Sequence, residues 1–505
     1  MGLSRYSDRG ADILGDREPA DPEPPALWNA PAASGPLSAR LSLPGSKSLT
    51  NRELVLSALA DGPSLLRRPL RARDTDLMAE ALRALGTGIE VRAAGSGPGD
   101  WLVTPGELTG STSIDAGLAG TVMRFLPPVA ALALGPVAID GDAHARERPM
   151  RTTIQALRDL GVEVVDDGRG ALPFTIQGTG RVEGGELTID ASASSQFVSG
   201  LLLSAPRFER GMTLRHRGER LPSMPHIEMT IDTLARRGVV VETPEPGVWI
   251  VPPGPIAGTE VDIEPDLSNA APFLAAALLA GGTVTIDGWP GRTTQVGALL
   301  AELLPRYGAS VRRETDGALT VDGGPGLVGG RAIAGVDLDL SAGGELAPTF
   351  AALAALAASP GRITGIGHLR GHETDRLAAL AAELTRIGAQ VTELDDGLAF
   401  DPVDRSALHG DVWRSYADHR MATTGALVGL AVPGIEVADI GTTAKTLPEF
   451  PELWAGMLGA APGIGGLPGA APRIGPGAAP SAGPGAGPGI EPGAAPGTGT
   501  SWIEL

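Results

Sequence analysis

The chain has 505 residues, too many for one ordinary hydrophobic core, and 42% of them are hydrophobic while 20% are charged. Its formal net charge of −19 disfavours nucleic acid and anionic membranes as partners, and its lack of cysteine excludes disulfides, thiolate metal ligands and a cysteine nucleophile. We therefore expect a globular, cytoplasmic protein of two or more domains. The apolar runs are too short to span a membrane, and the opening residues lack the apolar segment of a signal peptide.

The two ends of the sequence differ from the rest. Residues 1–36 are rich in proline and show no periodicity, and residues 459–505 are almost entirely Gly, Ala and Pro as far as Ser501. Because such segments cannot bury a core, we predict that both tails are disordered.

Two kinds of helix alternate between the tails. The first kind is short and apolar all round, begins in a polar loop, and recurs roughly every 70 residues, a period too long for a common solenoid. Its six copies begin near Ser48, Thr121, Ser195, Ser268, Glu345 and Asp418. The second kind is amphipathic and is followed by Gly and a β-branched strand. Its copies begin near Thr75, Thr152, Ile227, Thr294 and Thr374, with a shorter one near Phe450.

This alternation predicts an α/β fold of six repeats. A helix with an apolar circumference is buried, whereas an amphipathic helix covers the outside. Two groups of three repeats, each closing into one domain, is the simplest arrangement. The buried helices all begin in polar loops, and helix N-termini attract anions, so we expect a cleft between the domains that binds anionic ligands.

Several of these loops carry cationic side chains. "LPGSKSLTNR" holds Lys47 and Arg52, "DAGLAGTVMRFL" holds Arg124, and "RERPM" holds Arg148. Further along, "DASASSQFVSG", "GHETDRLAAL", "YADHRMA" and "TTAKTLPEF" also lie at or near helix starts. Taken singly, each fits a capped helix or a solvated charge equally well. Their shared position at the starts of repeated helices argues for one common site.

A metal site is not expected. His368 and His372 have a spacing that metal ligands can show, but a glycine lies between them in a loop and the sequence offers no third or fourth ligand nearby.

Seven motifs, in order, resemble those of the 5-enolpyruvylshikimate-3-phosphate synthase family. They are "PGSKSLTNR", "GLAGTVMRFL", "RERPM", "SASSQF", "GHETDR", "YADHRMA" and "TTAKTLPEF", within a resemblance that spans about 37–457. The resemblance implies two inside-out α/β domains, each of three βαβαββ units, joined by two hinge crossings. It places one domain at 37–46 plus 266–458 and the other at 47–265.

The resemblance also implies the reaction. The family transfers the enolpyruvyl group of phosphoenolpyruvate to the 5-hydroxyl of shikimate 3-phosphate, releases phosphate, and uses neither a metal nor an organic cofactor. On this basis the chain acts in the shikimate pathway to chorismate and aromatic amino acids. Its partners are these two small molecules, and we expect a monomer.

The motifs assign residues to each substrate by the same resemblance. Phosphoenolpyruvate is assigned to Lys47, Gly120, Arg124, Arg148, Gln196, Arg376, Arg420 and Lys445. Shikimate 3-phosphate is assigned to Ser48, Arg52, Ser194, Ser195, Gln196, Ser223, Glu345 and His372. Proton transfer is assigned to Lys47, Glu345, Glu373 and Lys445. Guanidinium groups suit planar carboxylate and phosphate, and two separated carboxylates with a lysine can remove one proton and deliver another.

Some positions depart from the family's usual pattern. Leu118 replaces Asn, His226 replaces Tyr, and His368 and His372 replace an Asn and a Lys that contact the shikimate phosphate in the family. We predict that His372 makes the KM for shikimate 3-phosphate rise with pH near neutrality.

Two alternatives remain open. A UDP-N-acetylglucosamine 1-carboxyvinyltransferase shares the fold, but its usual acid is a cysteine, which this chain lacks. The second alternative is a non-catalytic paralogue that binds the same metabolites. The retention of Lys47, Glu373 and Lys445 argues against it.

Overall fold

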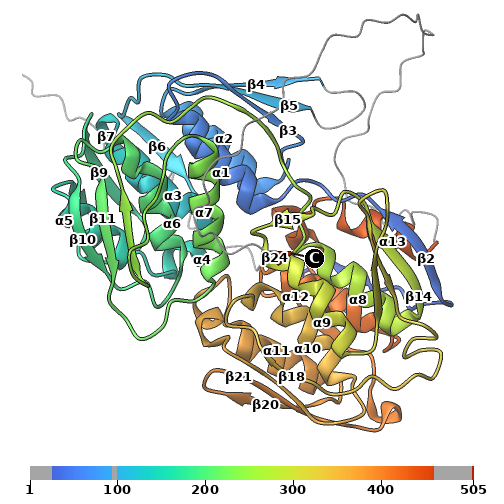
Figure 1. Cartoon of the computed structure of the whole chain (residues 1–505). Helices are drawn as coiled ribbons and strands as arrows, with labels where there is room; N and C mark the ends of the chain where they lie inside the picture. The colour runs from blue at the N-terminus through green and yellow to red at the C-terminus, as the bar shows by residue number, and fades with distance from the viewer. Residues whose placement is uncertain (1–24, 94–98, 460–502, 505) are drawn as a thin grey trace, which may run out of the picture.

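Two hydrophobic cores lie side by side in this computed structural model, which describes residues 25–93, 99–459 and 503–504 (Figure 1). Core A is built from buried residues within 30–43 and 267–457, and core B from buried residues within 49–263. The chain therefore changes core twice, once between Leu43 and Leu49 and once between Ile263 and Leu267.

Three buried helices occupy the centre of each core. Each of the six begins within two residues of its predicted start, and nearly all their residues are buried because no face meets water, although α1 departs from the predicted apolar circumference by burying polar and charged side chains such as Arg52 and Glu53. In core B they are α1 (Lys47–Ala58), α3 (Gly120–Ala131) and α6 (Gln196–Ser204), and in core A they are α8 (Ala270–Ala280), α10 (Ala347–Ala355) and α12 (His419–Gly429). Within each core the three helices contact one another.

Amphipathic helices cover these bundles and bury one face each. They are α2 (Arg73–Ala84), α5 (Arg151–Asp159), α7 (Met224–Arg236), α9 (Leu300–Arg306), α11 (Arg376–Arg386) and α13 (Phe450–Met457). The fourth copy differs from the prediction, because its first turn is a 3₁₀ helix at Val296–Leu299 that precedes a short α9. The first two residues of "RERPM", Arg146 and Glu147, form the end of an additional short helix, α4 (Ala143–Glu147).

The strands form four-stranded sheets with one repeated pattern, a parallel pair followed by two antiparallel pairings. Core B holds β13-β3-β5-β4 and β6-β7-β9-β8, and core A holds β16-β17-β14-β2 and β18-β19-β21-β20. Their bounds in core B are β3 Ser64–Arg67, β4 Gly88–Arg92, β5 Asp100–Thr104, β6 Thr112–Asp115, β7 Leu134–Asp140, β8 Glu163–Val165, β9 Phe174–Thr179 and β13 Glu260–Asp262. In core A they are β2 Leu37–Leu41, β14 Gly282–Ile286, β16 Ser310–Arg313, β17 Leu319–Asp322, β18 Asp337–Asp339, β19 Gly361–Thr364, β20 Gln390–Leu394 and β21 Gly397–Asp401.

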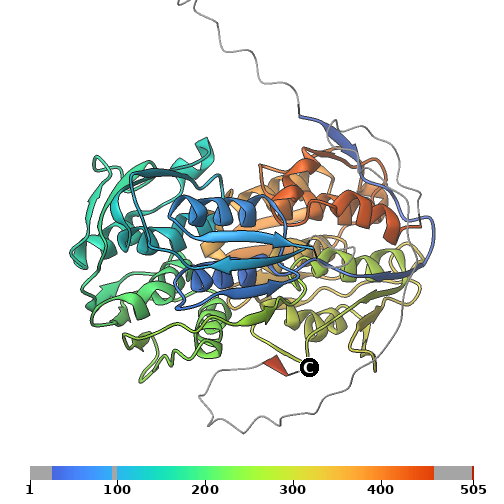
Figure 2. The same ribbon diagram turned by 90° about the horizontal axis from the view of Figure 1, so that it is seen from above.

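Two three-stranded sheets keep the parallel pair. One is β10 (Gly185–Ile189), β11 (Met212–His216) and β12 (Val248–Val251), and the other is β1 (Leu27–Asn29), β23 (Glu436–Ala438) and β22 (Val412–Arg414). The chain is thus a mixed α/β protein, with helices central to each core and sheets around them (Figures 1 and 2).

The two passages between the cores pair with each other. The Ser46 N–H donates to the Glu264 carbonyl at 2.7 Å, and the Asp266 N–H donates to the Pro44 carbonyl at 2.9 Å. Gly45 lies between them, where a Cβ would approach the Arg68 carbonyl oxygen to 2.4 Å, so a side chain here would separate the two segments. The predicted boundaries at 46/47 and 265/266 lie within these passages.

The prediction of disordered tails is wrong at two places. Leu27–Asn29 forms β1, which pairs with β23, and Ala30 is buried against core A. This segment is ordered because it pairs with a strand more than 400 residues away. Ile503–Glu504 forms β24, which pairs with β15 (Arg292–Thr293). Residues 1–24 and 460–502 lie outside the described residues.

A buried ion pair fixes α1, whose first turn carries Lys47 and Ser48, to α7. Arg237 is 1% exposed and donates to Glu53 from Nη2 at 2.6 Å and from Nε at 2.9 Å. Its remaining N–H groups donate to Ser57 and Ser64 and to the Ala257 carbonyl. Every donor of the guanidinium therefore has an acceptor, which offsets the cost of burying the charge.

Replacing Glu53 by Gln should destabilise the protein by about 3–5 kcal/mol, because the Arg237 charge would remain buried without its partner. Thermal unfolding would measure this. The double variant Glu53→Met/Arg237→Met removes both charges and should recover most of the loss. A Glu53→Gln protein as stable as the parent would contradict this role.

Candidate active site

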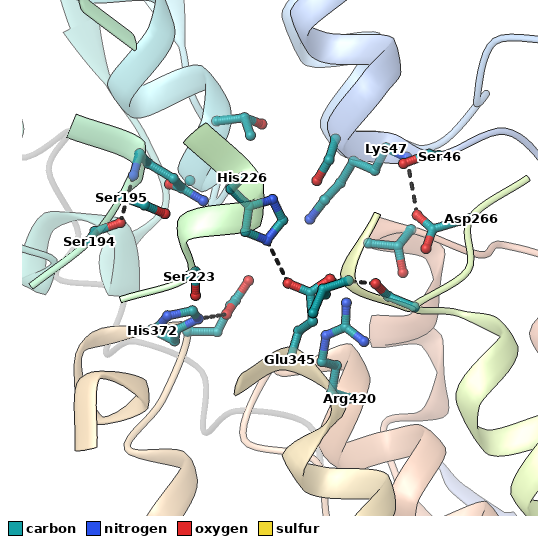
Figure 3. A pocket seen from close by; sticks show the side chains of 18 of the residues that line it. Ser46, Lys47, Ser194, Ser195, Ser223, His226, Asp266, Glu345, His372 and Arg420 are labelled. Carbon is teal, nitrogen blue, oxygen red and sulfur yellow. Dashed lines mark hydrogen bonds and ion pairs between the residues drawn. The ribbon is translucent and has the colours of Figure 1, made fainter. Parts of the chain in front are cut away.

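A deep pocket lies between the two cores, and the starts of all six buried helices contribute to it (Figure 3). From core B come Lys47, Gly120 and Gln196, the first residues of α1, α3 and α6. From core A come Ser268 and Asn269 before α8, Glu345 before α10, and His419 and Arg420 at the start of α12. The predicted convergence of polar helix starts on one site is confirmed.

One carboxylate caps a buried helix of each core. Asp266 Oδ2 accepts from the Lys47 N–H of α1 at 3.1 Å, and Asp266 Oδ1 accepts from the Asn269 N–H before α8 at 3.0 Å. A side-chain oxygen that satisfies free N–H groups at a helix start stabilises that start. Asp266 is not among the predicted residues, although its position before a repeated helix matches that of Ser46, the N-cap of α1.

Arginine side chains gather around Gly120. A Cβ at Gly120 would lie 3.0 Å from Gln196 Oε1, 3.1 Å from Arg148 Nη2 and 3.3 Å from Arg124 Nη1. Both arginines are almost fully buried, and the Nε of each has no hydrogen-bond partner among the residues that the structure describes. Burial and then the charge of Arg148 hold the pKa of Arg124 well below its usual value. Two adjacent, poorly neutralised guanidinium groups form a strong site for an anion.

A network of opposite charges adjoins this cluster, since Lys445 and Arg148 both donate to the Leu118 carbonyl. Arg376 donates from Nε to Asp418 at 2.7 Å and from Nη2 to Glu373 at 3.0 Å. Lys445 donates to Glu373 at 2.5 Å and to the Leu118 carbonyl of core B at 3.2 Å. Burial opposes ionisation of Glu373, but Lys445 and Arg376 outweigh it and keep its pKa well below the usual range. Burial also lowers the pKa of Lys445, against the charge of Glu373.

Glu345 is the second carboxylate of the pocket. Its Oε2 lies 2.6 Å from His226 Nε2 of core B, and its Oε1 accepts from the Ser268 hydroxyl. Burial would raise the pKa of Glu345, but the charge and hydrogen bond of His226, followed by Arg420 and Ser268, hold it far below the usual range. Glu345 is therefore ionised and able to accept a proton.

The hydroxyl side of the pocket comes mostly from core B. The pocket is lined by Ser48, Ser194, Ser195 and Ser223. Ser223 precedes α7 and has a φ of 54°. Its N–H donates to the Ser341 carbonyl of core A. Lys47 also lines the pocket, with its ammonium 3.3 Å from Asp74.

Three predicted residues do not line this pocket. Arg52 is 1% exposed and donates to Thr230 and to the Ser48 and His226 carbonyls. It therefore holds the backbone of two residues that line the pocket, Ser48 and His226. Arg124 lines an adjoining cavity with Arg148 and Gln196. Lys445 reaches the site through Glu373.

Three histidines of core A also line the pocket, and burial lowers the pKa of each. The pKa of His368 falls to about 4, through burial and then Arg376, and the same two causes hold the pKa of His372 well below its ordinary value. Burial and Arg420 do the same for His419. His372 in the free protein therefore does not titrate near its ordinary pKa, which removes the premise for the predicted rise of KM with pH near neutrality.

A mixed α/β fold with a pocket lined by arginines, lysine and two ionised carboxylates is typical of an enzyme that acts on small anionic substrates. Residues 31–454 match the family described as EPSP synthase (3-phosphoshikimate 1-carboxyvinyltransferase). A 3-phosphoshikimate 1-carboxyvinyltransferase of Kocuria rhizophila is 55% identical over 441 residues, which cover 86% of this chain and 97% of that protein. The chain belongs to this family, and its activity is 3-phosphoshikimate 1-carboxyvinyl transfer.

Solved structures agree on the fold. Two structures of EPSP synthase from Acinetobacter baumannii each superpose with a TM-score of 0.67 at 24% identity, covering 85% of this chain and 97% of theirs. At that identity the similarity establishes the fold alone. Among the described residues, none of the helices has the length and apolarity to cross a bilayer.

The acid stability of the protein should depend on His368. Because its pKa is about 4 when folded and near 6.5 when unfolded, the unfolded chain binds more protons, and stability falls as pH drops below 6.5. This amounts to at most about 3 kcal/mol at pH 4. Urea unfolding between pH 7.5 and 4.5 should show a shallower acid loss for His368→Asn than for the parent. Parallel losses in the two proteins would refute this assignment.

Proposed function

We propose that the pocket between the cores binds phosphoenolpyruvate and shikimate 3-phosphate together and transfers the enolpyruvyl group to the 5-hydroxyl. The carrying observation is one pocket region that combines guanidinium groups beside Gly120 (the arginine side), serine hydroxyls of core B (the serine side) and the two ionised carboxylates Glu345 and Glu373. Two polyanionic substrates need several cations and hydroxyl donors together, because each must be held without displacing the other.

Phosphoenolpyruvate fits the arginine side. The guanidinium groups of Arg124 and Arg148 lie beside Gly120, the Nε of each has no partner among the described residues, and Gln196 adds an amide at the same place. Lys47 of core B and Arg376 and Arg420 of core A line the same pocket. A phosphate and a carboxylate on one small molecule would satisfy both sets of donors and neutralise charges that are otherwise costly to bury.

Shikimate 3-phosphate fits the serine side, with Ser48, Ser194, Ser195 and Ser223 as donors to its phosphate and hydroxyls. His372 faces the same pocket from core A and, being neutral, offers one N–H rather than a positive charge. Arg52 acts through Ser48 and His226, whose carbonyls it holds.

The two carboxylates divide the proton transfers. Glu345 takes the proton of the 5-hydroxyl as that oxygen attacks C2 of phosphoenolpyruvate, and the Glu373–Lys445 pair delivers a proton to the C3 methylene. In the second step the same pair removes a proton from the C3 methyl group as the C–O bond to phosphate breaks. The proton from the hydroxyl leaves with the phosphate. Lys445 suits this role because burial lowers its pKa and makes its proton easier to give.

We propose further that cores A and B are domains that close on the substrates, since the lining comes from both and closure would exclude water. Both halves of the site belong to one chain, which supports a monomer. The lack of cysteine supports a cytoplasmic location.

Mixed with phosphoenolpyruvate and shikimate 3-phosphate, the protein should release phosphate, and UDP-N-acetylglucosamine should not replace the second substrate. Glu373→Gln should lower kcat by about 10²–10⁴-fold, because the shared proton would lose its acceptor. A correctly folded protein that binds both ligands without releasing phosphate would favour a non-catalytic paralogue.

Gly120→Ala should raise the KM for phosphoenolpyruvate about tenfold, because the added methyl group pushes against both guanidinium groups and the Gln196 amide. The KM for shikimate 3-phosphate should change much less. Gly456→Ala in α13 is a matched control, since its Cβ meets nothing within 4 Å. Equal changes in both KM values would argue against the arginine side as the phosphoenolpyruvate site.

A further inference from the structure

His226 joins the two cores through the second carboxylate of the site. Its Nε2 lies 2.6 Å from Glu345 Oε2, and the side chains are 18% and 17% exposed (Figure 3). His226 lies in the first turn of α7 in core B, whereas Glu345 lies in the 3₁₀ turn Gly344–Leu346 of core A. This contact therefore exists only while the two cores face each other closely.

Hydrogen bonds fix the backbone of His226, which limits the positions that its ring can take. Its N–H donates to the Ser223 carbonyl, and its carbonyl accepts from Arg52 Nη2 at 2.8 Å and from the Thr230 hydroxyl at 3.0 Å. Ser223 in turn contacts core A through the Ser341 carbonyl. The first turn of α7, which carries the ring, is thus held by contacts with both cores.

Glu345 has one partner on each oxygen. Ser268 occupies Oε1 and His226 occupies Oε2, which sets the plane of the carboxylate and leaves one lone pair on each oxygen for a substrate hydroxyl. The charged and titratable groups around it come from five elements: His226 of α7, Arg52 of α1, Arg420 of α12, Arg376 of α11 and His368 of the 3₁₀ turn Gly367–Gly371.

We propose that His226 is a positioning residue for Glu345, whose carboxylate it holds in place only while the two cores face each other closely. This rests on the proposed role of Glu345 as acceptor of the hydroxyl proton. Glu345 is then positioned as a base when the cleft closes, because moving the two cores apart would remove His226 from Glu345 Oε2. A Tyr at this position, usual in the family, could also donate a hydrogen bond, through its hydroxyl.

The test is the pH dependence of kcat at saturating substrates for the parent, His226→Phe and His226→Gln. Without the imidazole, burial would raise the pKa of Glu345, so the acid limb of kcat should move to higher pH. We expect kcat to fall at least about tenfold between pH 8 and pH 6 in His226→Phe and less than about twofold in the parent. His226→Gln restores an N–H donor and should give an intermediate shift.

Three further measurements separate the possible outcomes. His409→Gln changes an exposed histidine outside the pocket and should leave the profile unchanged. An unmoved acid limb in both His226 variants, with kcat abolished in Glu345→Gln, would overturn the inference and keep the proposed function. A Glu345→Gln protein with full kcat would instead overturn the role of Glu345 itself. If His226→Phe fails to fold, the shift in His226→Gln decides alone.

Discussion

The double capping by Asp266 is the constraint on which the rest of the site depends. One carboxylate satisfies a free N–H at the start of α1 in core B and another before α8 in core A. Both caps require the two passages between the cores to lie side by side, as the Ser46–Glu264 and Asp266–Pro44 backbone bonds ensure. The passages between the cores therefore also supply part of the pocket lining, through Ser46, Lys47 and Asp266.

Electrostatics explains why so acidic a chain can hold a cationic pocket. Within the site Arg376 and Lys445 are balanced by Asp418 and Glu373, whereas Arg124 and Arg148 are left with unpaired N–H groups. The charges that are balanced keep the pocket formed without ligand, and the unbalanced pair supplies the attraction for the substrate anion. The acidic surface elsewhere leaves this pocket as a local cationic region rather than part of a general polyanion-binding face.

The sequence predicted local features well and long-range partners poorly. The starts of the buried helices were predictable because an apolar circumference and a polar first turn are both local. The strand at Leu27–Asn29 was missed because its partner, β23, is remote and it lies within a proline-rich stretch of sequence. The His226–Glu345 bond joins residues 119 positions apart, so no spacing could indicate it. Asp266 could have been found from the repeat, since it precedes the fourth buried helix as Ser46 precedes the first.

The placement of β2 has a consequence for the order in which the chain can fold. Leu37–Leu41 is made early, yet its parallel partner is β14 at Gly282–Ile286, while β13 at Glu260–Asp262 completes the sheet of β3. During synthesis from the N-terminus, core B receives its last strand before core A receives the first partner of β2. The strand β2 therefore stays without its parallel partner while more than 200 residues are added after it, although β14 follows soon after the last residues of core B.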